Sequence, residues 1–220
     1  MIGLGRIAST IDEEIEKYEG HPLPFSHIAC YMDVPEIELV GMVDTWAEQR
    51  EAVKQRWGFN AIYDDYKTML RDTKPEIVSV CTSTKQRAEV VVELAKGGYG
   101  VKAIWAEKPF SISLAEADRM ITACQNANIA LAVNCGRRWR DGFRQAVAMI
   151  KDGLIGDLVH VQALTNCGIS HNGSHLLTTM TMFAGSRVNW VTGEADVNPD
   201  SPDDDFQAAG QVGFANGTRG

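Results

Sequence analysis

The sequence lacks any run of about 18 continuous apolar residues, the length that a membrane-spanning helix needs. Its start also lacks a charged stretch followed by an apolar core, so no secretory signal is predicted. Cysteine is sparse: the chain has five, and none forms a C-x-x-C pair. Scattered cysteines in odd number indicate reduced thiols that pack as small apolar side chains. We therefore expect a cytoplasmic protein that has no membrane partner.

Excess positive charge is missing too. The 21 Lys and Arg residues are outnumbered by 29 Asp and Glu, which gives a net charge of -8 at pH 7. Because the phosphates of nucleic acids are bound by basic surfaces, this balance argues against a nucleic-acid partner. Apolar residues make up 45% and charged residues 23% of the chain, as in an ordinary globular protein. The 220 residues suffice for one large domain or about one and a half ordinary ones.

Strand-like apolar runs alternate with amphipathic segments over the first two-thirds of the chain. Strands are predicted at residues 37–43, 77–81, 101–106 and 129–133. Helices are predicted at residues 45–57, 86–96 and 114–126, the last with Ser113 as its N-cap. This alternation is typical of a parallel sheet with crossover helices. We expect an α/β fold in which residues 1–134 form a Rossmann-type parallel sheet with helices on both faces.

Two parts of the chain depart from this pattern. Residues 12–34 contain a run of charged residues and are interpreted as an insertion before the second strand. From residue 135 the pattern changes to helices at 143–151 and 174–183 and strands at 158–164, 187–197 and 207–214. We expect residues 135–220 to form a truncated α+β domain with an open, mainly antiparallel sheet.

Both ends predict an incomplete domain. The glycine turn begins at Gly3, so only Met1 and Ile2 remain of an opening strand that usually has about 5–6 residues. At the other end, Asn216-Gly217 predicts a hairpin turn that almost no return strand follows. The chain is therefore interpreted as a fragment of a longer protein.

The segment Gly3-Leu4-Gly5-Arg6-Ile7-Ala8 fits the pattern G-x-G-x-x-A. The first glycine permits a tight turn, the second lets a dinucleotide's pyrophosphate approach the backbone, and the small third residue lets helix and strand pack closely. Gly3, Gly5, Arg6 and Ile7 are therefore candidate cofactor-binding residues. Glycine-rich loops are also common turns, so this motif is weak evidence by itself.

Asp44 at the end of the second predicted strand supports the dinucleotide hypothesis. A carboxylate there can accept hydrogen bonds from the hydroxyls of the adenosine ribose. Since it would repel a 2′-phosphate, we expect NAD in preference to NADP. The spacing from the glycines exceeds the usual value of about 20 residues, which the insertion explains. The alternative is an ordinary strand-end turn residue or helix N-cap.

The segment Ala106-Glu107-Lys108-Pro109-Phe110 directly follows a predicted strand. Ligands of open α/β sheets bind beyond the carboxyl ends of the strands, so Lys108 is expected to point into the cofactor crevice. A lysine there can hydrogen-bond a substrate hydroxyl and ease the loss of its proton. Pro109 restricts the backbone after it. The alternative is a surface lysine at a strand end.

Several of these features occur in the order found in one family of enzymes. They are the glycine turn, Asp44, Glu107-Lys108-Pro109, Asn134 followed by Arg137-Arg138, and Gly173-Ser174-His175. In these residues the chain resembles the Gfo/Idh/MocA family, which includes glucose-fructose oxidoreductase and inositol dehydrogenase. The resemblance covers essentially the whole chain, and Glu-Lys-Pro is its most specific motif.

The resemblance implies a nicotinamide-dependent oxidoreductase that transfers a hydride between NAD(P) and a hydroxyl-bearing carbon of a sugar or polyol. It implies a homo-oligomer for the full-length protein. It assigns Lys108 to the substrate hydroxyl and His175 to acid/base chemistry, for which an imidazole's ordinary pKa of about 6.5 is suitable. Thr82 and Glu107 become candidate cofactor contacts, together with Lys108. Arg138 is a candidate substrate contact, although a solvated or ion-paired arginine is an equal alternative.

The chain also departs from the family pattern. Many members have aspartate where His171 stands, and often another shortly after the histidine, where this chain has residues 177–179 without one. Ser83 replaces a usual proline and Arg87 a common histidine. These departures put the identity of the substrate in doubt. They leave open an alternative, a catalytically silent dinucleotide-binding sensor or regulatory protein.

His171 allows three interpretations. If the backbone is helical there, His171 and His175 lie one turn apart on one face. The pair could bind a metal ion, His171 could orient His175 or contact substrate, or it could be a polar residue without a role. We favour the second interpretation and expect no metal ion, because the sequence offers no obvious third ligand nearby.

Overall fold

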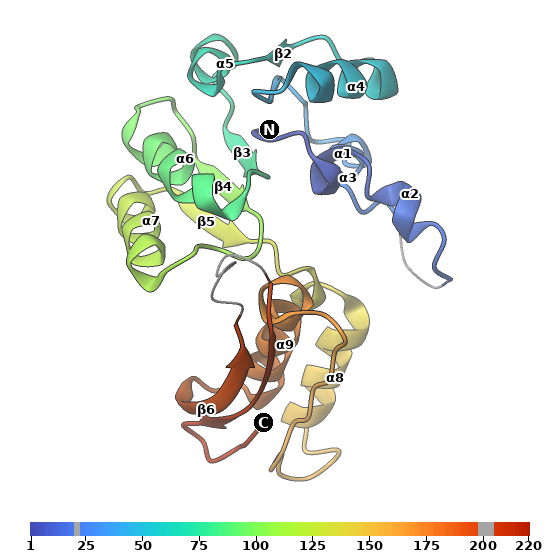
Figure 1. Ribbon diagram of the computed structural model, residues 1–220, viewed down its shortest axis with the longest axis vertical. Coiled ribbons are helices and arrows are strands. Elements are labelled where there is room, and N and C mark those ends of the chain that lie inside the picture. The colour runs from blue at the N-terminus through green and yellow to red at the C-terminus, as the bar shows by residue number, and fades with distance from the viewer. Residues whose placement is uncertain (20–22, 198–204) are drawn as a thin grey trace. The chain divides into compact units, whose positions relative to one another are not determined.

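The computed structural model describes residues 1–19, 23–197 and 205–220. They form two compact units, Met1–Asn134 and Cys135–Gly220, which are described separately (Figure 1). Within the segment 12–34, residues 20–22 lie outside the described residues. In the described parts of the chain, no helix is both long enough and apolar enough to cross a bilayer.

The first unit alternates short parallel strands with helices. Its strands are β1 (Met42–Val43), β2 (Ile62–Tyr63), β3 (Ile77–Val80), β4 (Ala103–Ala106) and β5 (Ala130–Val133). Its helices are α1 (Arg6–Ser9), α2 (Asp12–Ile15), α3 (His27–Met32), α4 (Ala47–Trp57), α5 (Tyr66–Thr73), α6 (Thr84–Lys96) and α7 (Leu114–Asn126). The Ser113 hydroxyl accepts a hydrogen bond from the Glu116 amide, so the predicted N-cap of α7 is confirmed.

Ile2 joins the strands of this unit into one sheet. β1 pairs with β2, and β3, β4 and β5 pair in that order, all in parallel. Ile2 bridges Val43 of β1 and Val80 of β3. The resulting order, β2-β1-Ile2-β3-β4-β5, is that of a dinucleotide-binding Rossmann sheet. The chain therefore changes winding direction beside Ile2, and the glycine turn lies at this switch point.

Each face of the sheet has its own apolar core. On one face, Ile2, Val43 and Val80 pack with buried residues of α5, α6 and α7. On the other face, Met1 and Met42 pack with buried residues of α1, α3 and α4. Neighbouring residues of a strand point to opposite faces of the sheet. Because both faces are covered here, the strands need apolar residues at consecutive positions. Figure 1 shows α6 and α7 on one side of β3, β4 and β5, with α1 and α3 on the other.

Two details differ from the sequence-based expectation. The strand predicted at 37–43 contains only Met42 and Val43, the two residues that form ladder pairs with β2 in the described chain. Of the earlier residues, Gly41 accepts a hydrogen bond from the Met1 amino group. The sequence also did not predict β2 and α5. Asp65 begins α5 as an N-cap, since its carboxylate accepts a hydrogen bond from the Thr68 amide.

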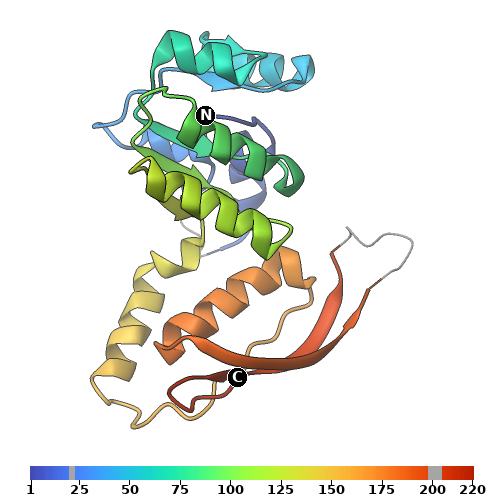
Figure 2. The same ribbon diagram turned by 90° about the vertical axis from the view of Figure 1, so that its left-hand side faces the viewer.

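The second unit contains helices and an antiparallel hairpin (Figure 2). Its elements are η1 (Gly136–Arg138), α8 (Asp141–Lys151), η2 (Ile169–Gly173), α9 (Ser174–Ala184), β6 (Val188–Asp196) and β7 (Gln207–Phe214). Met180 and Ala184 of α9 pack against Val212 and Phe214 of β7. Together with the first unit, this confirms the expected fold class.

The last residues of the chain decide which extended segments pair. The predicted turn at Asn216-Gly217 is present, with a hydrogen bond from the Phe214 amide to the Thr218 carbonyl. The strand predicted at 158–164 is wrong except for one bridge, from His160 to Arg219. An alternating pattern becomes a strand only where a partner backbone runs alongside, and in the described chain the ladder bonds of this segment join Val159 and Val161 to Arg219.

The glycine turn offers a direct test of the fold. Gly3 has φ +88°, and a Cβ atom there would lie 2.9 Å from backbone atoms of Cys81 and Thr82. At Gly5, no described atom beyond the two neighbouring residues lies within 4 Å of such a Cβ, and φ is −69°. We expect Gly3→Ala to lower the free energy of unfolding of the full-length protein by about 2 kcal/mol or more. Gly5→Ala, the control, should change it by less than about 1 kcal/mol. Urea denaturation measures both, and equal effects would contradict the assignment.

Candidate active site

The glycine turn is tied to Asp44 through the backbone. The Leu4 amide donates to Asp44 Oδ2 at 2.8 Å, and the Trp46 amide donates to Oδ1 at 2.9 Å. Asp44 therefore shapes both the glycine turn and the turn after β1, as one of the sequence-based alternatives proposed. It is not the N-cap of α4, a position that Trp46 occupies. Each carboxylate oxygen can accept a second hydrogen bond, so this half-buried side chain retains capacity for ribose hydroxyls.

The other residues of the glycine motif differ in how much room they leave for a ligand. Gly5 precedes α1 in extended conformation and leaves open space where a side chain would otherwise stand. Arg6 is exposed, and its Nε donates to Glu14 Oε1 at 2.6 Å. This hydrogen bond raises the pKa of Arg6 above its ordinary value. Ile7 is half-buried in α1. Gly5 is thus the member of the motif whose surroundings leave room for a ligand.

Thr82 follows β3 at the same edge of the sheet. Its Oγ1 atom is buried and has no hydrogen-bond partner among the described residues. A buried hydroxyl without a partner lowers stability unless a ligand or water supplies one. The open space at Gly5, the carboxylate of Asp44 and this hydroxyl all fit a dinucleotide bound across the switch point.

Glu107 is the most enclosed acidic residue of the site. It follows β4, is 4% exposed, and accepts hydrogen bonds from His27 Nε2 at 2.9 Å, Asn134 Nδ2 at 2.5 Å and the Lys108 amide at 3.1 Å. Burial acts to raise the pKa of Glu107, but the hydrogen bonds from His27 and Asn134 hold it below its usual value. Its carboxylate is therefore occupied within the protein and fixes the backbone that carries Lys108.

A line of hydrogen bonds continues from Glu107 to Tyr31. His27 Nδ1 lies 3.0 Å from Ser79 Oγ, which lies 2.5 Å from the Tyr31 hydroxyl. Since a carboxylate only accepts, His27 Nε2 carries the proton given to Glu107. Ser79 can then donate to His27 Nδ1, and Tyr31 to Ser79, so that each group in the line has a hydrogen-bond partner. Burial raises the pKa of Tyr31 to about 12, so its hydroxyl keeps its proton.

The sequence did not single out His27, Ser79 or Tyr31. His27 lies in α3, part of the segment interpreted as an insertion, yet it is 1% exposed and its ring centroid lies 4.3 Å from that of Trp105. The available signal was Ser26-His27 at the start of a short apolar helix. Ser26 is the N-cap of α3, and His27 is a buried residue of that helix.

His171 and His175 of the second unit lie in one continuous helical stretch. His171 is exposed in η2, a π-helical turn, and His175 is half-buried in the first turn of α9. The Asp205 carboxylate accepts hydrogen bonds from the amides of Ser170 and His171, at 2.7 and 3.1 Å. Asp205, which the sequence did not indicate, therefore anchors the turn that carries His171.

Within the described residues, no group of three or more His, Cys, Asp or Glu could hold a metal ion.

The remaining candidates are placed as follows. Lys108 is half-buried in the first unit. In η1 of the second unit, Arg138 is exposed and Arg137 is half-buried, and burial together with nearby Arg140 lowers the pKa of Arg137. Because Lys108 and His175 belong to different units, their cooperation stays a prediction.

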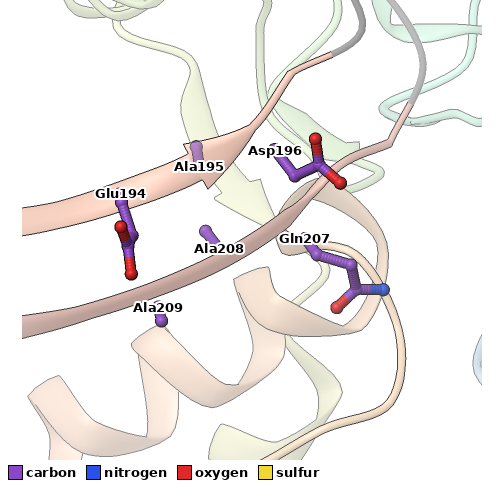
Figure 3. A pocket seen from close by; sticks show the side chains of 6 residues that line it. All are labelled: Glu194, Ala195, Asp196, Gln207, Ala208 and Ala209. Atoms are coloured by element: carbon purple, nitrogen blue, oxygen red, sulfur yellow. The ribbon is translucent and has the colours of Figure 1, made fainter.

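A hollow of about 440 Å³ lies along the hairpin of the second unit (Figure 3). Its lining residues are Glu194, Ala195, Asp196, Gln207, Ala208 and Ala209. None of them is a predicted site residue, so the hollow is not assigned to the candidate active site.

The buried carboxylate predicts a pH-dependent stability. Because the pKa of Glu107 is lowered on folding, its contribution is present above the ordinary glutamate value of about 4.3 and is lost as the pH falls through the folded-state value. Glu107→Gln should lower the free energy of unfolding by about 2 kcal/mol at pH 7 and flatten its decline in acid. Guanidine denaturation across pH measures both effects. Glu76→Gln, at an exposed ion pair with Lys102, is the control and should change little. Equal losses for both variants would contradict this assignment.

Comparison with known proteins agrees with this geometry. Residues 1–135 match the model of the Gfo/Idh/MocA oxidoreductase family with an NAD-binding Rossmann fold. D-apiose dehydrogenase of Paraburkholderia graminis is 30% identical over 131 residues, which are 60% of this chain and 34% of that protein. Myo-inositol 2-dehydrogenase of Thermotoga maritima is 27% identical over 166 residues, 76% of this chain and 44% of that protein. The chain thus spans less than half the length of these curated relatives.

Solved structures show the same fold. A probable dehydrogenase from Thermotoga maritima superposes with a TM-score of 0.75 at 23% identity, covering 100% of this chain and 66% of that one. An oxidoreductase from Agrobacterium radiobacter, in complex with NAD+, L-tartaric acid and magnesium, gives 0.71 at 21% identity, covering 86% and 59%. The family match covers more than half of the chain and includes the whole glycine turn, Asp44 and Glu107-Lys108-Pro109. The protein is therefore a member of the Gfo/Idh/MocA oxidoreductase family, whose matching region is an NAD-binding Rossmann fold.

Proposed function

We propose that the full-length protein is an NAD-dependent dehydrogenase that acts on a hydroxyl-bearing carbon of a sugar, a polyol or a related substrate. The observation that carries the proposal is a set of three groups at the switch point. They are Gly5 with open space, Asp44 with spare acceptor capacity, and Thr82 Oγ1, which has no hydrogen-bond partner among the described residues. The substrate class is supported by relatives named for D-apiose, myo-inositol and D-glucosides.

The proposed roles are those that the resemblance to the Gfo/Idh/MocA family assigns to these residues. A bound nicotinamide would accept or supply the hydride, which is chemistry that belongs to the cofactor. Lys108, on the backbone that Glu107 holds, would hydrogen-bond the substrate hydroxyl, and His175 would exchange its proton. His171 and Arg138, both exposed in the second unit, would contact the substrate. Gly3, Arg6 and Ile7 would shape the cofactor turn.

The assembly and the location of the protein are part of the proposal. β6 exposes Val188, Trp190 and Val191, at 43%, 41% and 71%. Exposed apolar residues that gather on one strand are typical of interaction surfaces. This supports a homo-oligomer. The cytoplasmic location stays an expectation from the cysteine content of the sequence. The sensor hypothesis stays as the second candidate, because His171 stands where many members of the family have aspartate.

The first prediction here concerns the choice of cofactor. Asp44 should make NAD bind more tightly than NADP, because its carboxylate repels a 2′-phosphate. Asp44→Asn should reduce the difference between the two affinities by about tenfold or more. Calorimetric titration of the full-length protein with each dinucleotide measures this. Glu48→Gln, exposed in the first turn of α4, is the control. Tighter binding of NADP by the wild type would overturn the prediction.

The second prediction separates cofactor binding from stability at Gly5. A methyl group there would occupy the open space beside the glycine turn. Gly5→Ala should therefore weaken NAD binding by about tenfold or more while the protein stays folded. Dinucleotide titration and thermal unfolding of the same sample test the two halves. Undiminished NAD binding would mean that the cofactor does not approach this residue.

The third prediction concerns catalysis. Lys108→Ala and His175→Ala should each lower turnover about 10²–10⁴-fold in the full-length protein, while NAD affinity changes little. The readout is absorbance of reduced nicotinamide with a panel of polyols and aldoses. Lys102→Ala, an exposed lysine of the same unit, is the control. Near-normal turnover of either variant would remove that residue from the mechanism. Absence of turnover in the wild type with every substrate would favour the sensor hypothesis.

A further inference from the structure

Arg87 is an arginine in the first turns of α6 that the fold buries almost completely. Only 2% of it is exposed, although arginine is among the residues least often buried. A buried guanidinium group is costly unless hydrogen bonds and a nearby opposite charge compensate for it. The partners that the fold supplies therefore indicate what the residue does.

The guanidinium group of Arg87 joins two loops at the carboxyl ends of neighbouring strands. Nη2 donates to the Thr82 carbonyl, after β3, at 2.6 Å. Nη1 donates to the Pro109 carbonyl, after β4. Burial lowers the pKa of Arg87 below its usual value, and the negative charge of Glu107 opposes this shift. A lysine donates from one nitrogen and could not reproduce this two-armed bridge.

The two bridged carbonyls belong to segments with different proposed tasks. Thr82 is a candidate cofactor contact, and the carbonyl of Pro109 follows directly after Lys108, the candidate for the substrate hydroxyl. Thr82 Oγ1 and Arg87 Nε are buried, and neither has a hydrogen-bond partner among the described residues. Arg87 Nε can therefore still donate a hydrogen bond beside the switch point, and Thr82 Oγ1 can still donate or accept one.

We propose that Arg87 is a positioning residue: it fixes the loop after β3 and the Glu107–Phe110 loop relative to each other, so that Thr82 and Lys108 are held ready for cofactor and substrate. This rests on the proposed dehydrogenase function. Arg87 does not act on the reacting atoms itself. Its role is to prevent a small displacement between two loops, and a displacement of about 1 Å can reduce a rate about 100-fold.

The first experiment measures the bridge without any ligand. Hydrogen exchange of backbone amides is compared in full-length wild type, Arg87→Lys and Arg87→Ala, below the unfolding transition of each. We expect faster exchange in both variants, confined to residues 82–86 and 107–111. Arg119→Ala is the matched control, because it removes a half-exposed arginine of α7 that forms an ion pair with Glu89 of α6. Unchanged exchange in either segment would overturn the proposal.

The second experiment measures the consequence for the cofactor. We expect Arg87→Lys and Arg87→Ala to bind NAD about tenfold more weakly, despite the charge that lysine retains. Methylguanidinium at non-denaturing concentration should restore part of the affinity to Arg87→Ala and slow its exchange, but should leave Arg119→Ala unaffected. Wild-type affinity in folded Arg87→Lys would overturn the proposal.

The outcomes for the two proposals differ. If the wild type binds neither NAD nor NADP, the proposed function fails. In that case, the exchange rates and their response to methylguanidinium still decide whether Arg87 holds the two loops together.

Discussion

The pairing of Ile2 with both Val43 and Val80 is the constraint on which the first unit depends. It makes one sheet out of two sets of strands and places the change of winding direction beside the glycine turn. The carboxyl ends of β1, β3 and β4 then lie at one edge, and each contributes one group that the proposed chemistry needs. Close contact of Gly3 with the backbone after β3 keeps that edge compact.

A second constraint arises from burying charge at this edge. Glu107 and Arg87 are both nearly inaccessible, at 4% and 2% exposure, so burying their charges is costly unless hydrogen bonds compensate. Glu107 takes donors from α3, from the end of β5 and from its own loop, whereas Arg87 takes carbonyls from two loops. These demands lock the backbone around Lys108 from both sides. Hydrogen bonds to two buried charged groups thus connect the segments of the site, in addition to apolar packing.

The sequence predicted those parts of the molecule that local patterns determine. Helix α7 has the predicted bounds, and the positions of Gly3, Asp44 and Lys108 at strand ends were readable from motif and periodicity. It did not predict β2, whose two residues form a strand only because β1 lies beside them. Nor did it predict the line from Tyr31 to Glu107, because Ser79 and Glu107 reach His27 across 52 and 80 residues of chain. Side-chain partnerships at such separations leave no periodic trace.

The contrast between Gly3 and Gly5 has a consequence for how related genes can diverge. Gly3 is required by the folded backbone itself, whereas Gly5 has open space around it. A lineage that gave up cofactor binding would remain under selection at the first position and could drift at the second. In a collection of related genomes, the ratio of replacements at these two sites would therefore distinguish descendants that still bind a dinucleotide from those that only keep the fold.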